Sequence, residues 1–217
     1  MLAFESVAPF INADSVSEIS SAEIRARAFK TVKRFGTEIE HVSAIFIPEI
    51  IADGKKYAET RAYGKEIREC AANARGQVSP DIALFRVSVA QDASVQKLWL
   101  EESARLGFLN VIPVGGESIK IQYPGPTPGE FMRLRYALDT DHPFRFGSVC
   151  IPQRGRVPRN GNTTIDQGLE SRKMTGKQMA GAEYFVTQIQ YDAEHLGPMI
   201  DLYLQRCQEL HIPPGTY

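Results

Sequence analysis

The stretch Leu2-Ala3-Phe4-Glu5-Ser6-Val7-Ala8-Pro9 (residues 2–9) decides between two folds for this chain. It contains the first of six short apolar runs that alternate with longer helical patterns, as strands of a parallel sheet do. The runs are Leu2 to Val7, His41 to Ile47, Ile82 to Val89, Phe108 to Val114, Phe146 to Ile151 and Tyr184 to Gln188. A doubly wound, dinucleotide-binding sheet places G-x-G-x-x-G directly after its first strand, whereas residues 5–9 read Glu-Ser-Val-Ala-Pro. We therefore expect a (β/α)₈ TIM barrel.

The chain is short for that fold. A complete barrel takes about 250 residues, and this chain has 217. We expect the last one or two β/α units to be lacking, so that the chain is either a fragment or a barrel with unusual closure. No linker or change in composition divides residues 1–217, which we expect to form a single barrel domain.

Capping signals support the helices between the strands. Residues 20–23 read Ser-Ser-Ala-Glu, which predicts a capping box, and Gly36 follows where a helix should end. Thr127-Pro128-Gly129-Glu130 predicts a second capped start. After Asp92 and Asp192 the apolar spacing predicts two more helices, and less regular patterns predict helices near residues 60–75 and 166–179.

Composition excludes several classes of function. The formal charge is -1, which gives no field to attract nucleic acid. No apolar run has the roughly 18 residues of a membrane span, and the first residues lack a signal-peptide pattern, so we expect a cytoplasmic protein. The three cysteines, Cys70, Cys150 and Cys207, are far apart and predict neither disulfides nor a metal site.

Polar residues at the predicted strand ends are the candidates for chemistry, because barrel active sites lie at the carboxyl ends of the strands. Burial would raise the pKa of Glu5 and suit it to be a general acid; the alternative is an ion pair with Arg86 across the barrel. Glu117 follows two glycines, a pattern typical of a ligand-binding turn but also of an ordinary turn. Arg154 lies in an arginine-rich loop, residues 153–161, that suits phosphates or is simply solvated. Gln188 ends the last run, where a buried amide needs a partner.

In order along the chain, these strand ends resemble the methylenetetrahydrofolate reductase family, flavoenzymes with a (β/α)₈ barrel. The matching motifs are Phe4-Glu5 followed by Pro9, Val114-Gly115-Gly116-Glu117, and Lys177-x-x-Ala180-Gly181-Ala182-x4-Thr187-Gln188. The third motif is fairly specific, and the resemblance covers nearly the whole chain. It implies an oxidoreductase of one-carbon metabolism and methionine biosynthesis, which reduces 5,10-methylenetetrahydrofolate to 5-methyltetrahydrofolate with hydride from FAD and NAD(P)H.

The resemblance also implies roles for single residues. Glu5 would protonate the folate as its ring opens, Glu117 would act beside the flavin and pterin as a catalytic and substrate-binding acid, and Gln188 would bind the pterin. The implied cofactor contacts are Lys177, Glu170, Gly115, Gly116 and Arg154.

The flavin side departs from the family pattern more than the folate side does. A basic flavin contact is missing before Gly116, and residues 44–49 and 151–153 lack the family's threonine, tyrosine and histidine contacts. Two explanations are open: FAD is bound through altered contacts that use Arg154, Arg156 or Arg159, or hydride passes directly from a nicotinamide cofactor without flavin. Two further hypotheses stay open: a pterin-dependent methyltransferase, and a degenerate, non-catalytic barrel subunit whose exposed edges need a partner. We also expect a homo-oligomer with a small-molecule substrate.

Overall fold

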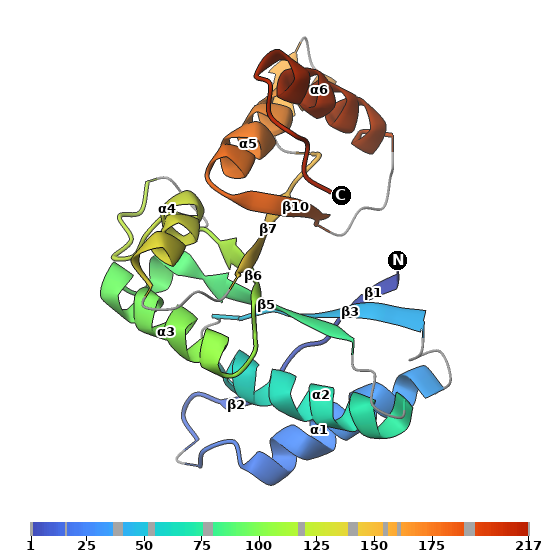
Figure 1. Cartoon of the computed structure of the whole chain (residues 1–217), viewed down its shortest axis with the longest axis vertical. Coiled ribbons are helices and arrows are strands. Elements are labelled where there is room, and N and C mark those ends of the chain that lie inside the picture. The colour runs from blue at the N-terminus through green and yellow to red at the C-terminus, as the bar shows by residue number, and fades with distance from the viewer. Residues whose placement is uncertain are drawn as a thin grey trace.

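A six-stranded parallel sheet with its strands in chain order forms the centre of the molecule (Figure 1). The computed structural model describes residues 2–15, 17–36, 41–51, 55–75, 80–116, 120–138, 143–153, 156–159, 162–188 and 194–216. The sheet runs β1 (Leu2–Glu5), β3 (Val42–Ile47), β5 (Asp81–Val87), β6 (Asn110–Val114), β7 (Arg145–Cys150) and β10 (Ala182–Thr187). These strands lie within one or two residues of the predicted runs.

Helices follow the sheet strands in turn and lie on one face of the sheet. They are α1 (Ser21–Phe35), α2 (Thr60–Arg75), α3 (Ala93–Arg105), α4 (Pro128–Arg133), α5 (Gln167–Met179) and α6 (Leu196–Glu209), with short 3-10 turns η2 (Ser88–Ala90) and η3 (Leu134–Ala137). In Figure 1 they follow the sheet around, from α1 and α2 at the bottom through α3 and α4 to α5 and α6 at the top. We call the helix-covered face of the sheet the outer face and the other the inner face.

Local sequence sets several helix ends, as predicted. Ser20 and Glu23 form both halves of a capping box at the start of α1, and Gly36 ends that helix with φ 51°. Thr127 caps α4 in the same reciprocal way. Because both patterns place hydrogen-bonding side chains against the unpaired first N–H groups of a helix, they act locally and could be read from the sequence.

The register of the sheet has the stagger of a barrel. A single row of paired residues runs through Glu5, Phe46, Ala83, Asn110 and Arg145. This row joins the last residue of β1 to the first residue of β7, so the strands are strongly offset along their direction. Such an offset accompanies the strand tilt of closed barrels. The architecture is therefore an α/β half-barrel, and a closed barrel of eight strands is not shown.

The segment after α6 lies against the edge of β10. Thr216 forms an isolated parallel bridge with Tyr184, and its backbone N–H donates to the carbonyl of Glu183 at 3.0 Å. The hydroxyl of Tyr203 holds the same segment by accepting from the N–H of Gly215 at 2.8 Å. Residues 213–216 thus begin to add a strand to the sheet.

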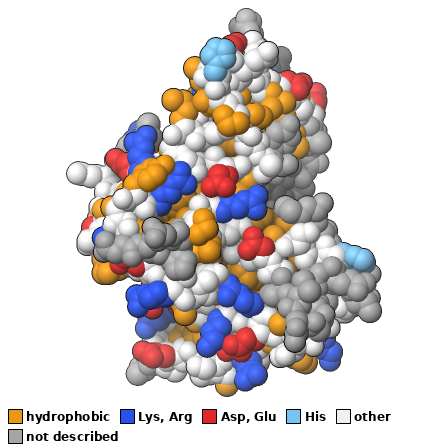
Figure 2. Space-filling model, viewed as in Figure 1, with side chains coloured by type: hydrophobic (Ala, Val, Ile, Leu, Met, Phe, Trp, Pro, Cys, Tyr) orange, Lys and Arg blue, Asp and Glu red, His pale blue; other side chains and the backbone are white. Residues whose placement is uncertain are grey.

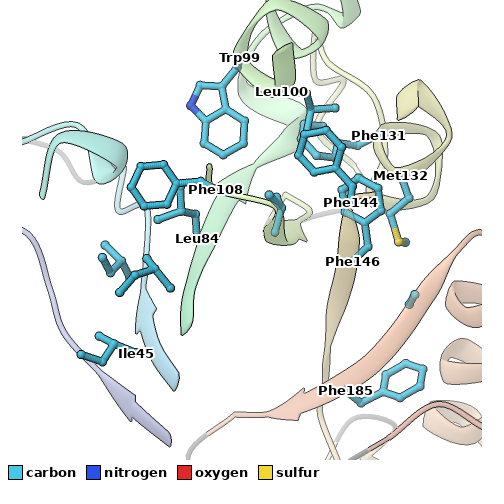
Figure 3. Packing of buried hydrophobic residues seen from close by; sticks show 14 of the residues in the cluster. Ile45, Leu84, Trp99, Leu100, Phe108, Phe131, Met132, Phe144, Phe146 and Phe185 are labelled. Carbon is cyan, nitrogen blue, oxygen red and sulfur yellow. The ribbon is translucent and has the colours of Figure 1, made fainter. Parts of the chain in front are cut away.

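The main core lies between the outer face and the helices. Figure 3 shows its aromatic part, with Phe131 and Phe146 packed edge to face at 6.2 Å and Trp99 beside them. Gly64 in α2 is needed where Phe108 meets this helix, because a Cβ there would lie 3.0 Å from the Phe108 ring. The core holds the helices against the outer face of the sheet.

Four short strands were not predicted. β2 (Phe10–Asn12) pairs antiparallel with β4 (Lys55–Tyr57), and β8 (Arg156–Arg159) pairs with β9 (Asn162–Ile165). The arginine-rich stretch after β7, expected to be a loop, thus includes a β-strand. Both pairs lie in connections that follow carboxyl ends of sheet strands.

The surface charges and the helices bear on two expectations from the sequence, that the chain has no field to attract nucleic acid and no membrane span. On the face shown in Figure 2, basic and acidic side chains are interspersed rather than gathered by sign. Among the described residues, no helix is long and apolar enough to cross a membrane.

Candidate functional site

The inner face brings Glu5 to the carboxyl end of β1. The neighbours of Glu5 point outward: Phe4 packs on Phe35 of α1 at 4.4 Å between ring centroids, and Ser6 Oγ shares a hydrogen bond of 2.8 Å with Tyr63 Oη. Glu5 therefore projects from the opposite face, because strand side chains alternate. Its side chain is exposed, so the expectation of a desolvated carboxylate is wrong for this structure.

Gln188, which directly follows β10, also lies on the inner face. Phe185 points outward to Tyr203, with 5.3 Å between ring centroids, while Tyr184 and Val186 belong to the inner-face cluster. The next inner position along the strand is Gln188, whose backbone N–H donates to the carbonyl of Cys150 at 3.2 Å. Its side chain is exposed rather than buried. Glu5 and Gln188 thus end the two outermost strands of the sheet on the same face.

An apolar floor extends across the inner face between these two strands. Ala83, Ile112 and Tyr184 are buried, and Phe46, Phe85, Val149 and Val186 are partly buried against them. The rings of Phe46 and Phe85 meet edge to face, with 6.1 Å between centroids and an interplanar angle of 87°. We call Phe46, Phe85, Val149 and Val186 the inner floor. It offers flat apolar contact beside polar groups at the rim.

Tyr184 closes the amino-terminal end of the inner face. Its hydroxyl donates to Asn110 Oδ1, and Asn110 Nδ2 donates to Asp81 Oδ2 at 2.8 Å. The Arg145 guanidinium lies over the Tyr184 ring at 4.9 Å. Burial raises the pKa of Tyr184, so its hydroxyl stays protonated and keeps donating. Gly147 leaves the space for this ring.

Arg86 forms an ion pair with Glu49, and the alternative pairing of Arg86 with Glu5 is wrong. Arg86 Nη1 lies 2.5 Å from Glu49 Oε1, its Nε donates to Gln96 at 2.8 Å, and its guanidinium lies over Trp99 on the outer face. Glu49 Oε2 also accepts from the N–H of Val87 at 2.6 Å. Arg86 therefore cannot reach Glu5, because its side chain leaves β5 on the opposite face.

Glu49 is a carboxylate that sequence reasoning missed. Burial raises its pKa, against the opposing effect of Arg86. It lines a pocket of about 240 Å³ together with Pro48, Ile50, Tyr57 and Glu59. The signal in the sequence was an acid two residues after the second apolar run, at the carboxyl end of a strand. A larger groove, of about 390 Å³, lies at the amino end of β10, away from these strand ends.

The two predicted cofactor-binding glycines pack against the chain itself. A Cβ on Gly116 would lie 2.2 Å from the ring of Tyr123, and one on Gly115 would lie 3.4 Å from Pro128. The loop before α4 therefore occupies the space that a ligand was expected to take. Gly125 brings that loop down onto η2, where a Cβ would meet the carbonyl oxygen of Gln91 at 2.0 Å.

Lys177 and Glu170 lie beneath β7 on the outer face. Lys177 Nζ donates to the carbonyl of Val149 and lies 3.8 Å from Glu170 Oε1. Glu170 is fully buried, and the same oxygen accepts from the N–H of Ile151 at 3.0 Å. These contacts hold α5 to the end of β7. The cofactor role of both residues stays a prediction.

Two predicted site residues, Glu117 and Arg154, lie outside the described residues. Within the described ranges there is no group of three or more His, Cys, Asp or Glu side chains that could hold a metal ion. Of the predicted set, the structure therefore brings Glu5 and Gln188 to one face, and it adds Glu49 on the other side of the sheet.

Comparisons with known proteins give the fold. No protein-family model matches the chain, and no curated protein matches it. A solved structure of an uncharacterized protein from Clostridium thermocellum, which binds two copies of 5-methyl-5,6,7,8-tetrahydrofolic acid, aligns with a TM-score of 0.69 at 13% identity. The alignment covers 99% of this chain and 63% of that chain. The chain shares that fold.

A second solved structure, Arabidopsis ADAL complexed with GMP, aligns with a TM-score of 0.44 at 12% identity. It covers 84% of this chain and 50% of that chain, and it is too dissimilar to inform the site. The present chain spans less than two thirds of the length of the Clostridium protein.

Proposed function

We propose that this chain binds a reduced folate at the inner face, between the carboxyl ends of β1 and β10. The observation that carries the proposal is the arrangement of Glu5 and Gln188 on one face, with the inner floor between them. An amide can both donate to and accept from one edge of a pterin, and a carboxylate accepts N–H groups or transfers a proton. The Clostridium protein of similar fold, which binds a methyltetrahydrofolate, supports this choice of ligand.

The reaction we propose is reduction of 5,10-methylenetetrahydrofolate to 5-methyltetrahydrofolate. Glu5 supplies a proton to the ring nitrogen whose bond to the methylene carbon breaks, which leaves an iminium at the other nitrogen. Hydride from NAD(P)H then adds to the iminium carbon and gives the methyl group.

The described residues that were predicted to bind FAD have contacts within the chain. Gly116 is packed by Tyr123, and Lys177 and Glu170 are engaged with β7. No step of the proposed reaction is therefore assigned to FAD. An absorption spectrum of the purified protein tests flavin binding directly, because bound oxidised flavin would give visible bands.

We further propose that the half-barrel corresponds to the first six β/α units of a (β/α)₈ barrel. The barrel-like stagger of the sheet and the bridge of Thr216 to β10 support this proposal. Homo-oligomer formation stays a prediction, which light scattering after size-exclusion chromatography would test.

Titration calorimetry with 5-methyltetrahydrofolate tests the binding proposal. Gln188→Ala should weaken binding by about tenfold, which corresponds to about 1.4 kcal/mol and is typical of a lost polar contact. Thr187→Ala is the matched control, because Thr187 is also exposed but alternates to the other face. Absence of any binding heat with the unmodified protein would overturn the proposal.

A kinetic measurement separates the proposed reductase from a methyltransferase or a non-catalytic binder. Oxidation of NAD(P)H should depend on added methylenetetrahydrofolate, and Glu5→Gln should slow this oxidation by a larger factor than it weakens folate binding. A protein that binds folate without this oxidation is not a reductase.

A further inference from the structure

Two aromatic side chains on the inner face are less buried than the aromatic side chains of the main core. Phe108, Phe131 and Phe146, on the outer side, are at most 1% exposed, whereas Phe46 and Phe85 are only partly buried. The two partly buried rings are adjacent and perpendicular, so they present both a ring face and a ring edge. Partly exposed aromatic pairs inside a curved sheet are a place where a flat ligand can stack.

The surroundings of this pair define what would stack there. Phe46 is the sheet partner of Glu5, so a carboxylate stands immediately beside one ring. Val149 and Val186, which are paired with each other, continue the floor toward Gln188. A ligand that fits has an apolar flat face and N–H donors along one edge, since the rim supplies a carboxylate and an amide. A reduced pterin has this combination.

We infer that Phe46 and Phe85 form the surface on which the pterin ring of the folate lies, and that they select for a flat ring. The inference rests on the proposed folate site and adds the orientation of the ligand within it. The ring lies on the floor with its polar edge toward Gln188 and the nitrogens that carry the methylene bridge toward Glu5, and the aminobenzoyl-glutamate tail extends away from the floor. The contribution of the pterin ring to the binding free energy therefore depends on the phenyl rings of Phe46 and Phe85 and not on the aminobenzoyl-glutamate tail.

Calorimetry with two ligands and three variants tests this arrangement. The ligands are 5-methyltetrahydrofolate and 6-methyltetrahydropterin, which lacks the tail. Phe85→Leu and Phe46→Leu keep an apolar side chain of similar size but remove the ring, and each should weaken binding of both ligands about fivefold to tenfold. Phe29→Leu is the control, because Phe29 is 60% exposed on α1. It should bind like the unmodified protein.

A conservative variant is the control for a simple folding defect. Phe85→Tyr keeps the ring and should bind within about twofold of the unmodified protein, and thermal unfolding of every variant shows whether the fold is retained. A Phe85→Leu protein that is folded and binds both ligands normally would overturn the inference while the folate site stands. Weakened binding of the folate but not of the tail-free pterin would also overturn it. If the unmodified protein binds neither ligand, the proposed function itself fails.

Discussion

Gly147 carries the sharpest structural prediction. It lies in β7 beside Tyr184, and a Cβ on Gly147 would meet the Tyr184 ring at 2.3 Å and its hydroxyl oxygen at 2.7 Å. Real Cβ atoms do not approach this closely, so Gly147→Ala must displace the ring. Since Tyr184 is buried and donates its hydroxyl to Asn110, the ring cannot move without breaking that bond.

Two contributions make up the loss in the free energy of unfolding that we expect from Gly147→Ala. Forcing an extra methyl into a packed interior costs about 1 to 3 kcal/mol. Leaving the Tyr184 hydroxyl or Asn110 without its buried partner costs about 1 to 3 kcal/mol more. We therefore expect Gly147→Ala to lower the free energy of unfolding by about 2 to 6 kcal/mol, a large part of the about 5 to 15 kcal/mol of an ordinary domain.

Urea unfolding followed by circular dichroism measures this change. The control is Gly176→Ala in α5, where nothing lies within 4 Å of the added Cβ. It should stabilise the protein by about 0.5 to 1 kcal/mol, because alanine is the better helix former. In a Tyr184→Ala background, which empties the space, the cost of Gly147→Ala should largely disappear. Equal stabilities of Gly147→Ala and the unmodified protein would refute the reasoning.

Two further predictions concern charge and the segment after α6. Burial raises the pKa of Glu49, so the unmodified protein should lose stability relative to Glu49→Gln as the pH rises above the ordinary value of 4.5. Glu130 should show the opposite sign, because the Thr127 hydroxyl lowers its pKa and stability is gained as the pH rises through 4.5. Urea unfolding between about pH 3.5 and 6.5 tests both, and parallel curves would contradict them. Tyr203→Phe removes the acceptor for the Gly215 N–H and should speed deuterium exchange of that amide, whereas Tyr136→Phe, at a residue 76% exposed, should not.

Much of the architecture could be predicted because it depends on local patterns. The apolar runs located all six strands of the sheet, and the capping residues Ser20 and Thr127 located two helix starts. The four short strands could not be predicted, since three or four residues carry little periodicity. Their pairing depends on which loops the sheet brings together.

The candidate site was only partly predictable. Strand alternation and strand order suffice to place Glu5 and Gln188 at one end of the sheet, as expected. The surroundings of Gly116 and Lys177 were not foreseeable, because Tyr123 and the end of β7 reach them only through the folded chain. Arg86 shows the same limit: a one-residue difference in position along β5 decides which face its side chain leaves, and it pairs with Glu49.

The sequence by itself determined the order of strands and helices, the parallel sheet and several helix ends. Each of these follows from side-chain periodicity or from hydrogen bonds between residues three or four apart. Only the tertiary structure decided how exposed Glu5 and Gln188 are, what lies against Gly116, and which acid pairs with Arg86. Exposure and ion pairing depend on atoms contributed by distant segments, and the register and curvature of the sheet bring those atoms together.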